Sequence, residues 1–193
     1  MHNLTPWCHT SHIADAPFVA RYLPPIDWWQ RWIRSGMPSL QRDVRFEKHA
    51  DINRCTIDAP NGTLRLTIPI QKTDSVAPLV GGILISPHGQ WQHKHWHALQ
   101  SSYAGSPYFD YYSDDIRPIY DNPPQLLADF NETLIYIMAH LIGLDIPTIT
   151  QHICLTEPCE TYYQMFAQKH RFQPNLSIAD LLFCMGPESI YFL

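Results

Sequence analysis

Residues 54–70 read RCTIDAPNGTLRLTIPI, and this stretch decides the fold class. Aliphatic residues occupy every second position over 64–70, which predicts a strand with one buried face. The pair Asn61–Gly62 precedes that strand and is typical of a tight turn, because both residue types accept positive φ angles. We therefore predict a β-hairpin near residues 54–70.

Apolar residues at spacings of three and four predict helices on both sides of the hairpin. The expected helices cover residues 27–34, 90–103, 122–143 and 177–185. Asn122 and Pro123 are predicted to begin the third, as N-cap and first helical residue. Ser177 is the predicted N-cap of the fourth, and Asp180 three residues later resembles the acidic partner of a capping box.

Short apolar runs at 83–85 and 146–153 indicate further strands between the helices. Strands mixed with helices favour an α/β fold: a single mixed layered domain with the hairpin and several amphipathic helices. No linker divides the chain. The domain is therefore expected over residues 18–193, after an irregular N-terminal arm over residues 1–17.

The composition excludes several classes of protein. Thirteen basic and eighteen acidic residues give a net charge of −5 over 193 residues, so no general basic field would attract nucleic acid. No apolar stretch is long enough to insert into a membrane, and no secretory signal is evident. The five cysteines form no Cys-x-x-Cys pair. A cytoplasmic protein with reduced thiols is expected.

Four histidines cluster at 88, 93, 95 and 97. His93 and His97 have the i, i+4 spacing that can hold zinc on a helix. The segment lacks the glutamate of a metalloprotease, and Lys94 adds a neighbouring positive charge. We therefore expect no metal, with His95 pointing inward and its neighbours solvated.

Arg54 and Cys55 begin the hairpin. Arginine can hold a carboxylate or phosphate with two hydrogen bonds, although Arg54 could instead pair with a nearby acid. Cys55 would be a nucleophile if a histidine lowered its pKa. Its place on the apolar strand face favours a buried thiol instead. Phosphate-loop and dinucleotide motifs are absent from the sequence, so no cofactor is expected.

The segment 106–115, SPYFDYYSDD, is dense in aromatic and acidic residues. Such a set suits a sugar, whose ring face stacks on an aromatic side chain and whose hydroxyls need hydrogen-bond acceptors. The same pattern would arise if a helix packed onto the core through its aromatic residues. The sequence leaves both interpretations open.

The motifs together resemble the WbqC-like protein family, and the short C-terminus resembles a compact subgroup of it. The matching motifs are YLPP at 22–25, NRCTI at 53–57, LTIPI at 66–70, WQHKHWHAL at 91–99, SPYF at 106–109, DFN at 129–131 and NLSIADLLF at 175–183. Their order from about residue 18 to the C-terminus carries the resemblance. It implies a bacterial cytoplasmic protein linked to surface polysaccharide (O-antigen) biosynthesis.

The first functional hypothesis is a transferase that moves an acyl or aminoacyl group to an amino-sugar nucleotide. Its partner would be a small-molecule substrate such as a nucleotide sugar. Catalysis is assigned to His95, as general base, and Arg54. Substrate binding is assigned to motif residues: Tyr22, Asn53, Lys72, Trp96, Tyr108, Tyr111 and Asn131.

The second hypothesis is a non-catalytic interaction protein that supports envelope assembly. Low charge, many aromatic residues and 17 prolines suit an interaction surface. The two hypotheses differ in what they require of the fold. A polar cleft that contains both Arg54 and His95 would favour the enzyme, and a broad exposed apolar patch would favour the interaction protein.

Overall fold

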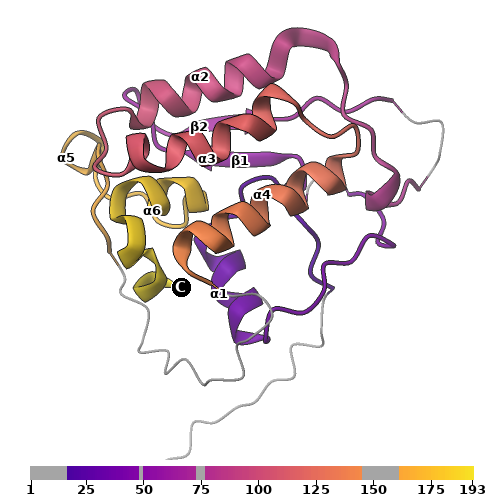
Figure 1. Cartoon of the computed structure of the whole chain (residues 1–193), viewed down its shortest axis with the longest axis horizontal. Coiled ribbons are helices and arrows are strands. Elements are labelled where there is room, and N and C mark those ends of the chain that lie inside the picture. Colours follow the sequence, from indigo (N-terminus) through magenta and orange to yellow (C-terminus); the bar gives the residue numbers. More distant parts are fainter. Residues whose placement is uncertain (1–16, 48–49, 73–76, 145–160) are drawn as a thin grey trace, which may run out of the picture.

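The computed structural model describes residues 17–47, 50–72, 77–144 and 161–193. It shows a single mixed α/β domain in which helices outnumber strands (Figure 1). The predicted strand over 146–153 lies outside the described residues, as does nearly all of the predicted N-terminal arm.

The hairpin is confirmed. Strand β1 (Arg54–Ile57) pairs antiparallel with β2 (Leu64–Thr67) in the register Cys55 opposite Leu66 and Thr56 opposite Arg65. Side chains alternate across a strand, so Cys55, Ile57 and Leu66 turn toward the core. Arg54 and Arg65 lie on the other face, where this register makes them diagonal neighbours.

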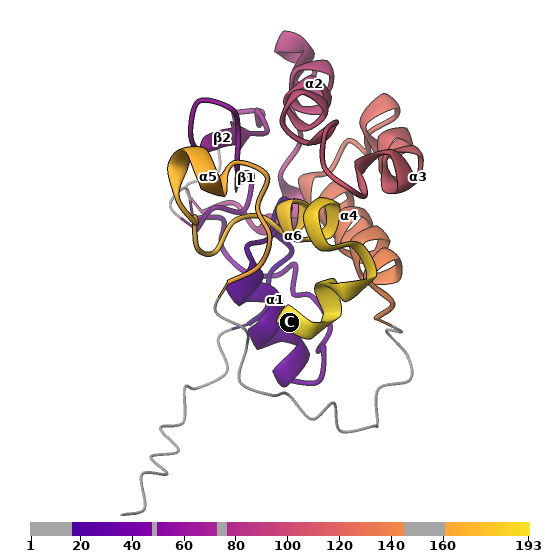
Figure 2. The same cartoon turned by 90° about the vertical axis from the view of Figure 1, so that its left-hand side faces the viewer.

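In chain order the helices are α1 (Ile26–Arg34), α2 (Trp91–Tyr103), α3 (Phe109–Asp121), α4 (Leu127–Ile142), α5 (Ala167–His170) and α6 (Ile178–Met185). Helices α2, α3, α4 and α6 lie on one side of the hairpin, whereas the short helix α5 lies beside its turn, at Pro60 (Figures 1 and 2). Helices α2, α3 and α4 pack side by side in that order, and α6 contacts α1, α3 and α4. Nearly every residue of α6 is buried, so this helix forms the centre of the core.

Helix α1 owes its position to three tryptophans. Trp28, Trp29 and Trp32 recur at helical spacing and are all buried, with ring centroids 5.3 to 5.7 Å apart. Aromatic pairs at these separations are favourable in addition to the area that they bury. The chain before α1 is thereby fixed in place, which matters because Arg21, Leu23 and Pro25 line the candidate site.

Three local predictions are wrong. Helix α4 begins at Leu127 rather than at Asn122, because the chain just before it pairs with the segment at 83–85. Leu126 is extended and bridges Leu84, and the Ile85 amide donates to the Gln125 carbonyl. The run at 83–85 accordingly forms isolated bridges rather than a strand. Asp180 also does not cap α6; Ser177 caps it alone, through the amide of Ala179.

Candidate functional site

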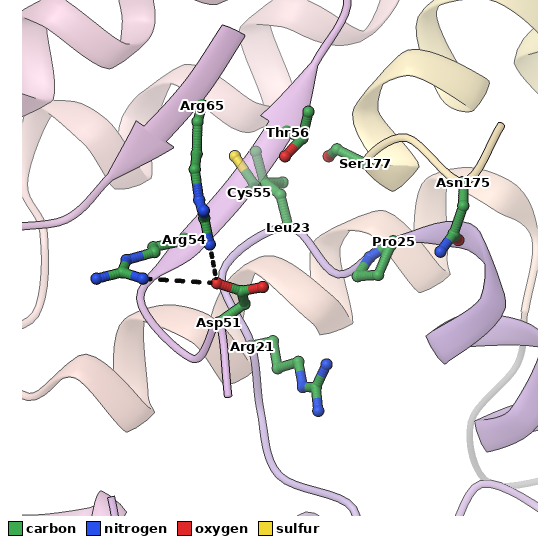
Figure 3. Close-up of a pocket in the computed structure, with 10 residues that line it drawn as sticks. All are labelled: Arg21, Leu23, Pro25, Asp51, Arg54, Cys55, Thr56, Arg65, Asn175 and Ser177. Carbon is green, nitrogen blue, oxygen red and sulfur yellow. Dashed lines mark hydrogen bonds and ion pairs between the residues drawn. The ribbon is translucent and has the colours of Figure 1, made fainter. Parts of the chain in front are cut away.

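A pocket of about 190 Å³ lies where the outer face of the hairpin meets the segments before α1 and before α6 (Figure 3). Its side chains come from three stretches that are distant in the sequence. The lining residues are Arg21, Leu23, Pro25, Asp51, Arg54, Cys55, Thr56, Arg65, Asn175 and Ser177. We call it the arginine pocket.

Backbone hydrogen bonds hold the three stretches together. The Ser177 amide donates to the Thr56 carbonyl over 2.9 Å, and the Ile178 amide donates to the Pro24 carbonyl over 3.0 Å. Behind the pocket, the Tyr22 amide donates to the Ile52 carbonyl over 2.9 Å. The pocket wall is therefore built from main chain that is fixed on all sides, which suits a preorganised binding site.

The arginine pocket has an excess of positive charge. Asp51 is its single carboxylate, and it pairs with Arg65 and, over 3.8 Å, with Arg54 (Figure 3). Within the described part of the chain, no carboxylate pairs with the half-buried Arg21. Burial, and then the nearby charge of Arg31, lower the pKa of the Arg21 guanidinium. An anion in the pocket would offset both effects.

Below the pocket, a chain of polar side chains enters the core. The Tyr22 hydroxyl contacts the Cys55 thiol and lies 3.1 Å from Nδ1 of His95 and 2.9 Å from the Tyr120 hydroxyl. Burial lowers the pKa of the His95 imidazole to about 4, against a backbone hydrogen bond with Thr67 that raises it. His95 is therefore neutral at pH 7. Burial also raises the pKa of the Cys55 thiol, so the thiolate is disfavoured.

Of the residues that the sequence assigns to the site, Arg54 lines the arginine pocket. Tyr22 and His95 lie beneath it in the core and reach it only through Cys55. The cleft that would contain both Arg54 and His95 is therefore not formed by this pocket.

Asn53 and Asn131 are buried and bind backbone. Asn53 Nδ2 donates to the Ile68 carbonyl over 2.8 Å, which fastens the end of the hairpin. Asn131 Nδ2 donates to the carbonyls of Ala20 and Ile52, 3.1 and 2.9 Å away. Both contacts tie separate segments together, and neither side chain lines the arginine pocket.

The other assigned residues lie elsewhere. Lys72 is exposed beyond the hairpin, and Tyr111 is 74% exposed on α3. Tyr108 packs its ring against the backbone of Gly186, while Trp96 lines a second pocket between α2 and α3. The structure does not bring these residues to the arginine pocket, and their roles stay predictions.

The structure adds Arg21, Asp51 and Arg65 to the site. Arg65 was detectable in the sequence, because a hairpin register that pairs Thr56 with it puts it on the same face as Arg54. Arg21 carries no such signal, since its position depends on contacts between distant segments, whereas Asp51 is a local neighbour of Arg54, three residues before it. Among the described residues, no group of three histidine, cysteine or acidic side chains is close enough to hold a metal ion.

A second buried polar cluster surrounds Asp180. Its two carboxyl oxygens accept from the hydroxyls of Tyr103 and Tyr162, over 2.8 and 2.6 Å. Burial raises the pKa of the Asp180 carboxyl to about 6, although these two hydrogen bonds lower it. Burial also raises the pKa of the nearby Asp58 carboxyl.

This pKa predicts a pH-dependent stability. Between pH 4 and 6 the folded state keeps the Asp180 proton that the unfolded chain has released, so the free energy of unfolding falls as pH rises. The rise of the Asp180 pKa from 3.8 to about 6 corresponds to about 3 kcal/mol of stability at low pH, and this stability is lost as pH rises through about 6. In urea unfolding at pH 4.5 and 7, Asp180→Asn should remove this part of the dependence. An equal slope in the variant would contradict it.

The fold and the site define the class: a small mixed α/β protein with a preorganised, arginine-lined pocket beside a two-stranded hairpin. The chain belongs to the WbqC-like protein family, whose model matches residues 20–157. That match contains the hairpin and all three arginines of the pocket, whereas α6 and the C-terminal motif lie beyond it. Neither a curated protein nor a solved structure matches the chain. No described helix is long and apolar enough to cross a bilayer.

Proposed function

We propose that the arginine pocket binds the phosphate or carboxylate group of a small substrate. The protein would then be a cytoplasmic transferase that moves an acyl or aminoacyl group to an amino-sugar nucleotide in bacterial surface polysaccharide biosynthesis. The observation that carries this proposal is the charge of the pocket: three arginines and one carboxylate line it, in a protein of net charge −5. Arginine matches the planar geometry of phosphate and carboxylate.

The surroundings of the pocket support a ligand larger than a free anion. A neighbouring cavity of about 240 Å³ shares Arg21 and is walled by apolar residues such as Phe18 and Val19. Arg31, Arg45 and Glu47 also line it. A ligand with its anionic group at Arg54 and an apolar portion beyond Arg21 would occupy both spaces.

The proposed transfer is a nucleophilic substitution at a carbonyl. The amino nitrogen of the sugar attacks the carbonyl carbon of an activated acyl donor, so a C–N bond forms. The bond from that carbon to the leaving group breaks with its electron pair. The amine releases one proton to a base. The sequence assigns this role to His95, whose imidazole lies beneath the pocket behind Cys55 and Tyr22.

Binding of a phosphorylated ligand tests the proposal. Titration calorimetry with a uridine diphosphate amino sugar and with pyrophosphate should show that Arg54→Ala and Arg21→Ala each weaken binding about 10- to 100-fold. This range follows from about 1.5–3 kcal/mol for a hydrogen bond to a charged group. Thermal stabilisation by the ligand should decrease in parallel.

Arg34→Ala is the matched control. This arginine is exposed at the end of α1 and does not line the arginine pocket, so its removal changes the net charge equally without touching the site. It should alter the affinity less than about two-fold at physiological salt, where exposed charges are screened beyond about 8 Å. The proposal fails if no anionic ligand binds, or if Arg34→Ala weakens binding as much as Arg54→Ala.

A further inference from the structure

A second pocket, of about 340 Å³, opens between the start of α2 and the end of α3, on residues that the arginine pocket does not use. Its volume is at the lower end of the range for small-molecule sites, about 300–1,000 Å³, and suits one ring better than an extended chain. The lining side chains used below are Gln90, Gln92, His93, Trp96, Arg117 and Asp121.

Trp96 supplies an aromatic wall that is held rigidly. Its ring centroid lies 6.0 Å from that of Phe109 and 5.7 Å from that of Tyr120, and both of these neighbours are buried. The Tyr120 hydroxyl is fixed in turn, 2.9 Å from that of Tyr22. Trp96 itself stays partly exposed at the pocket, whereas the other described tryptophans are buried.

The polar groups beside Trp96 are available to a ligand. Within the described residues, the side chains of Gln90, Gln92 and His93 form no hydrogen bond or ion pair. A side-chain amide offers both donors and an acceptor, and a neutral imidazole offers one of each. A ligand with several hydroxyl groups could satisfy this set, because each hydroxyl also donates and accepts.

The pocket is close to neutral. Arg117 and Asp121 pair with each other over 3.4 Å, and the Arg117 guanidinium lies 5.9 Å from the centroid of the Trp96 ring. The charges at this rim therefore cancel, in contrast to the arginine pocket. An uncharged ligand is favoured over an anion.

The backbone at the entrance is strained. Gln90 has φ 49° and ψ 40°, in the left-handed region that is costly for a residue with a side chain, and it follows Gly89 at φ 87°. Strained positions of this kind cluster at ligand sites, where the surrounding structure maintains them. Gln90 and Gln92 both line the same pocket as Trp96.

From these observations we infer that the second pocket binds one uncharged sugar ring, with an apolar face of the ring against Trp96 and the hydroxyls on Gln90, Gln92 and His93. The inference does not depend on the proposed function, because it uses none of the residues of the arginine pocket.

The indole N–H resonance of Trp96, in protein labelled with ¹⁵N-tryptophan, is the direct readout. It is assigned as the peak that Trp96→Phe removes. Titration of the full-length protein with methyl glucoside, methyl galactoside and N-acetylglucosamine should shift this peak in a saturable way for at least one sugar. Gln92→Ala should weaken that binding at least five-fold. Gln100→Ala, an exposed glutamine later in α2, should leave it unchanged.

Three results would overturn the inference. The first is that none of the three sugars shifts the Trp96 peak. The second is that adenosine, titrated in the same way, is the one ligand that shifts it, which would make this a base-binding site. The third is that Gln92→Ala leaves the sugar-induced shift unaltered. Arg21→Ala should not affect the titration. Sugar binding that survives Arg21→Ala, together with failure of the pyrophosphate titration, would refute the proposed function and leave this inference standing.

Discussion

Replacing Asn131 with alanine is expected to lower the free energy of unfolding by about 3 kcal/mol. The side-chain amide of this fully buried residue donates to the carbonyls of Ala20 and Ile52, which belong to segments far from α4 in the sequence. Loss of the donor leaves the buried Ala20 carbonyl without a partner and removes one of two hydrogen bonds to Ile52. Each such loss costs about 1–3 kcal/mol. Urea unfolding followed by circular dichroism measures the change.

Thr133→Ala is the control for this variant. Thr133 is exposed on the same helix and bonds only to a carbonyl of that helix, so the change should stay within about 0.5 kcal/mol. The sequence assigns Asn131 to substrate binding, and that role makes a different prediction. If Asn131→Ala unfolds at the wild-type urea concentration but no longer binds a sugar nucleotide, the residue acts on the substrate rather than on the fold.

Replacing Gly186 with alanine should be about as harmful, at about 3 kcal/mol or more. Gly186 has φ 57° and ψ −130°, a combination that only glycine adopts readily. An added Cβ would also lie 2.6 Å from the ring of Tyr108, so that ring would have to move. Strain and overpacking each cost about 1–3 kcal/mol. The midpoint of urea unfolding should fall accordingly.

Gly143→Ala separates the two causes. Gly143 ends α4 at φ 84°, and a Cβ there would meet no atom within 4 Å, so only the cost of the left-handed backbone applies, about 1–2 kcal/mol. A double-mutant cycle with Tyr108→Ala should recover the steric part of the Gly186→Ala cost. Additive effects in the cycle would show that Tyr108 does not oppose the new methyl group.

The buried chain at Tyr22 touches both candidate sites. Cys55, at one end, lines the arginine pocket, and Tyr120, at the other, lines the second pocket. Tyr22 has no exposed surface and contacts both of them and His95. Substitutions along this chain would disturb both pockets, so the experiments proposed for each site use residues outside it.

Periodic patterns predicted elements well where burial alone decides structure. The predicted bounds of α1, α2 and α6 agree with the observed helices within one or two residues, and the hairpin forms where alternation placed it. The aromatic segment at 106–115 includes the start of helix α3, which packs onto the core through the buried side chains of Phe109 and Tyr112. The prediction failed at the start of α4, because residues 125 and 126 pair with a segment some forty residues earlier.

The sequence by itself determined the hairpin, the helices that carry apolar stripes and the membership of the WbqC-like family. It also identified Arg54 as a candidate ligand group. Only the tertiary structure decided which polar residues share a pocket and which, like Asn131, form buried hydrogen bonds that hold separate segments together. The physical reason is that the buried face of a helix or strand follows from the periodic spacing of apolar residues within one segment. The charge excess of the arginine pocket is complete only when Arg21 joins Arg54 and Arg65 from a distant segment.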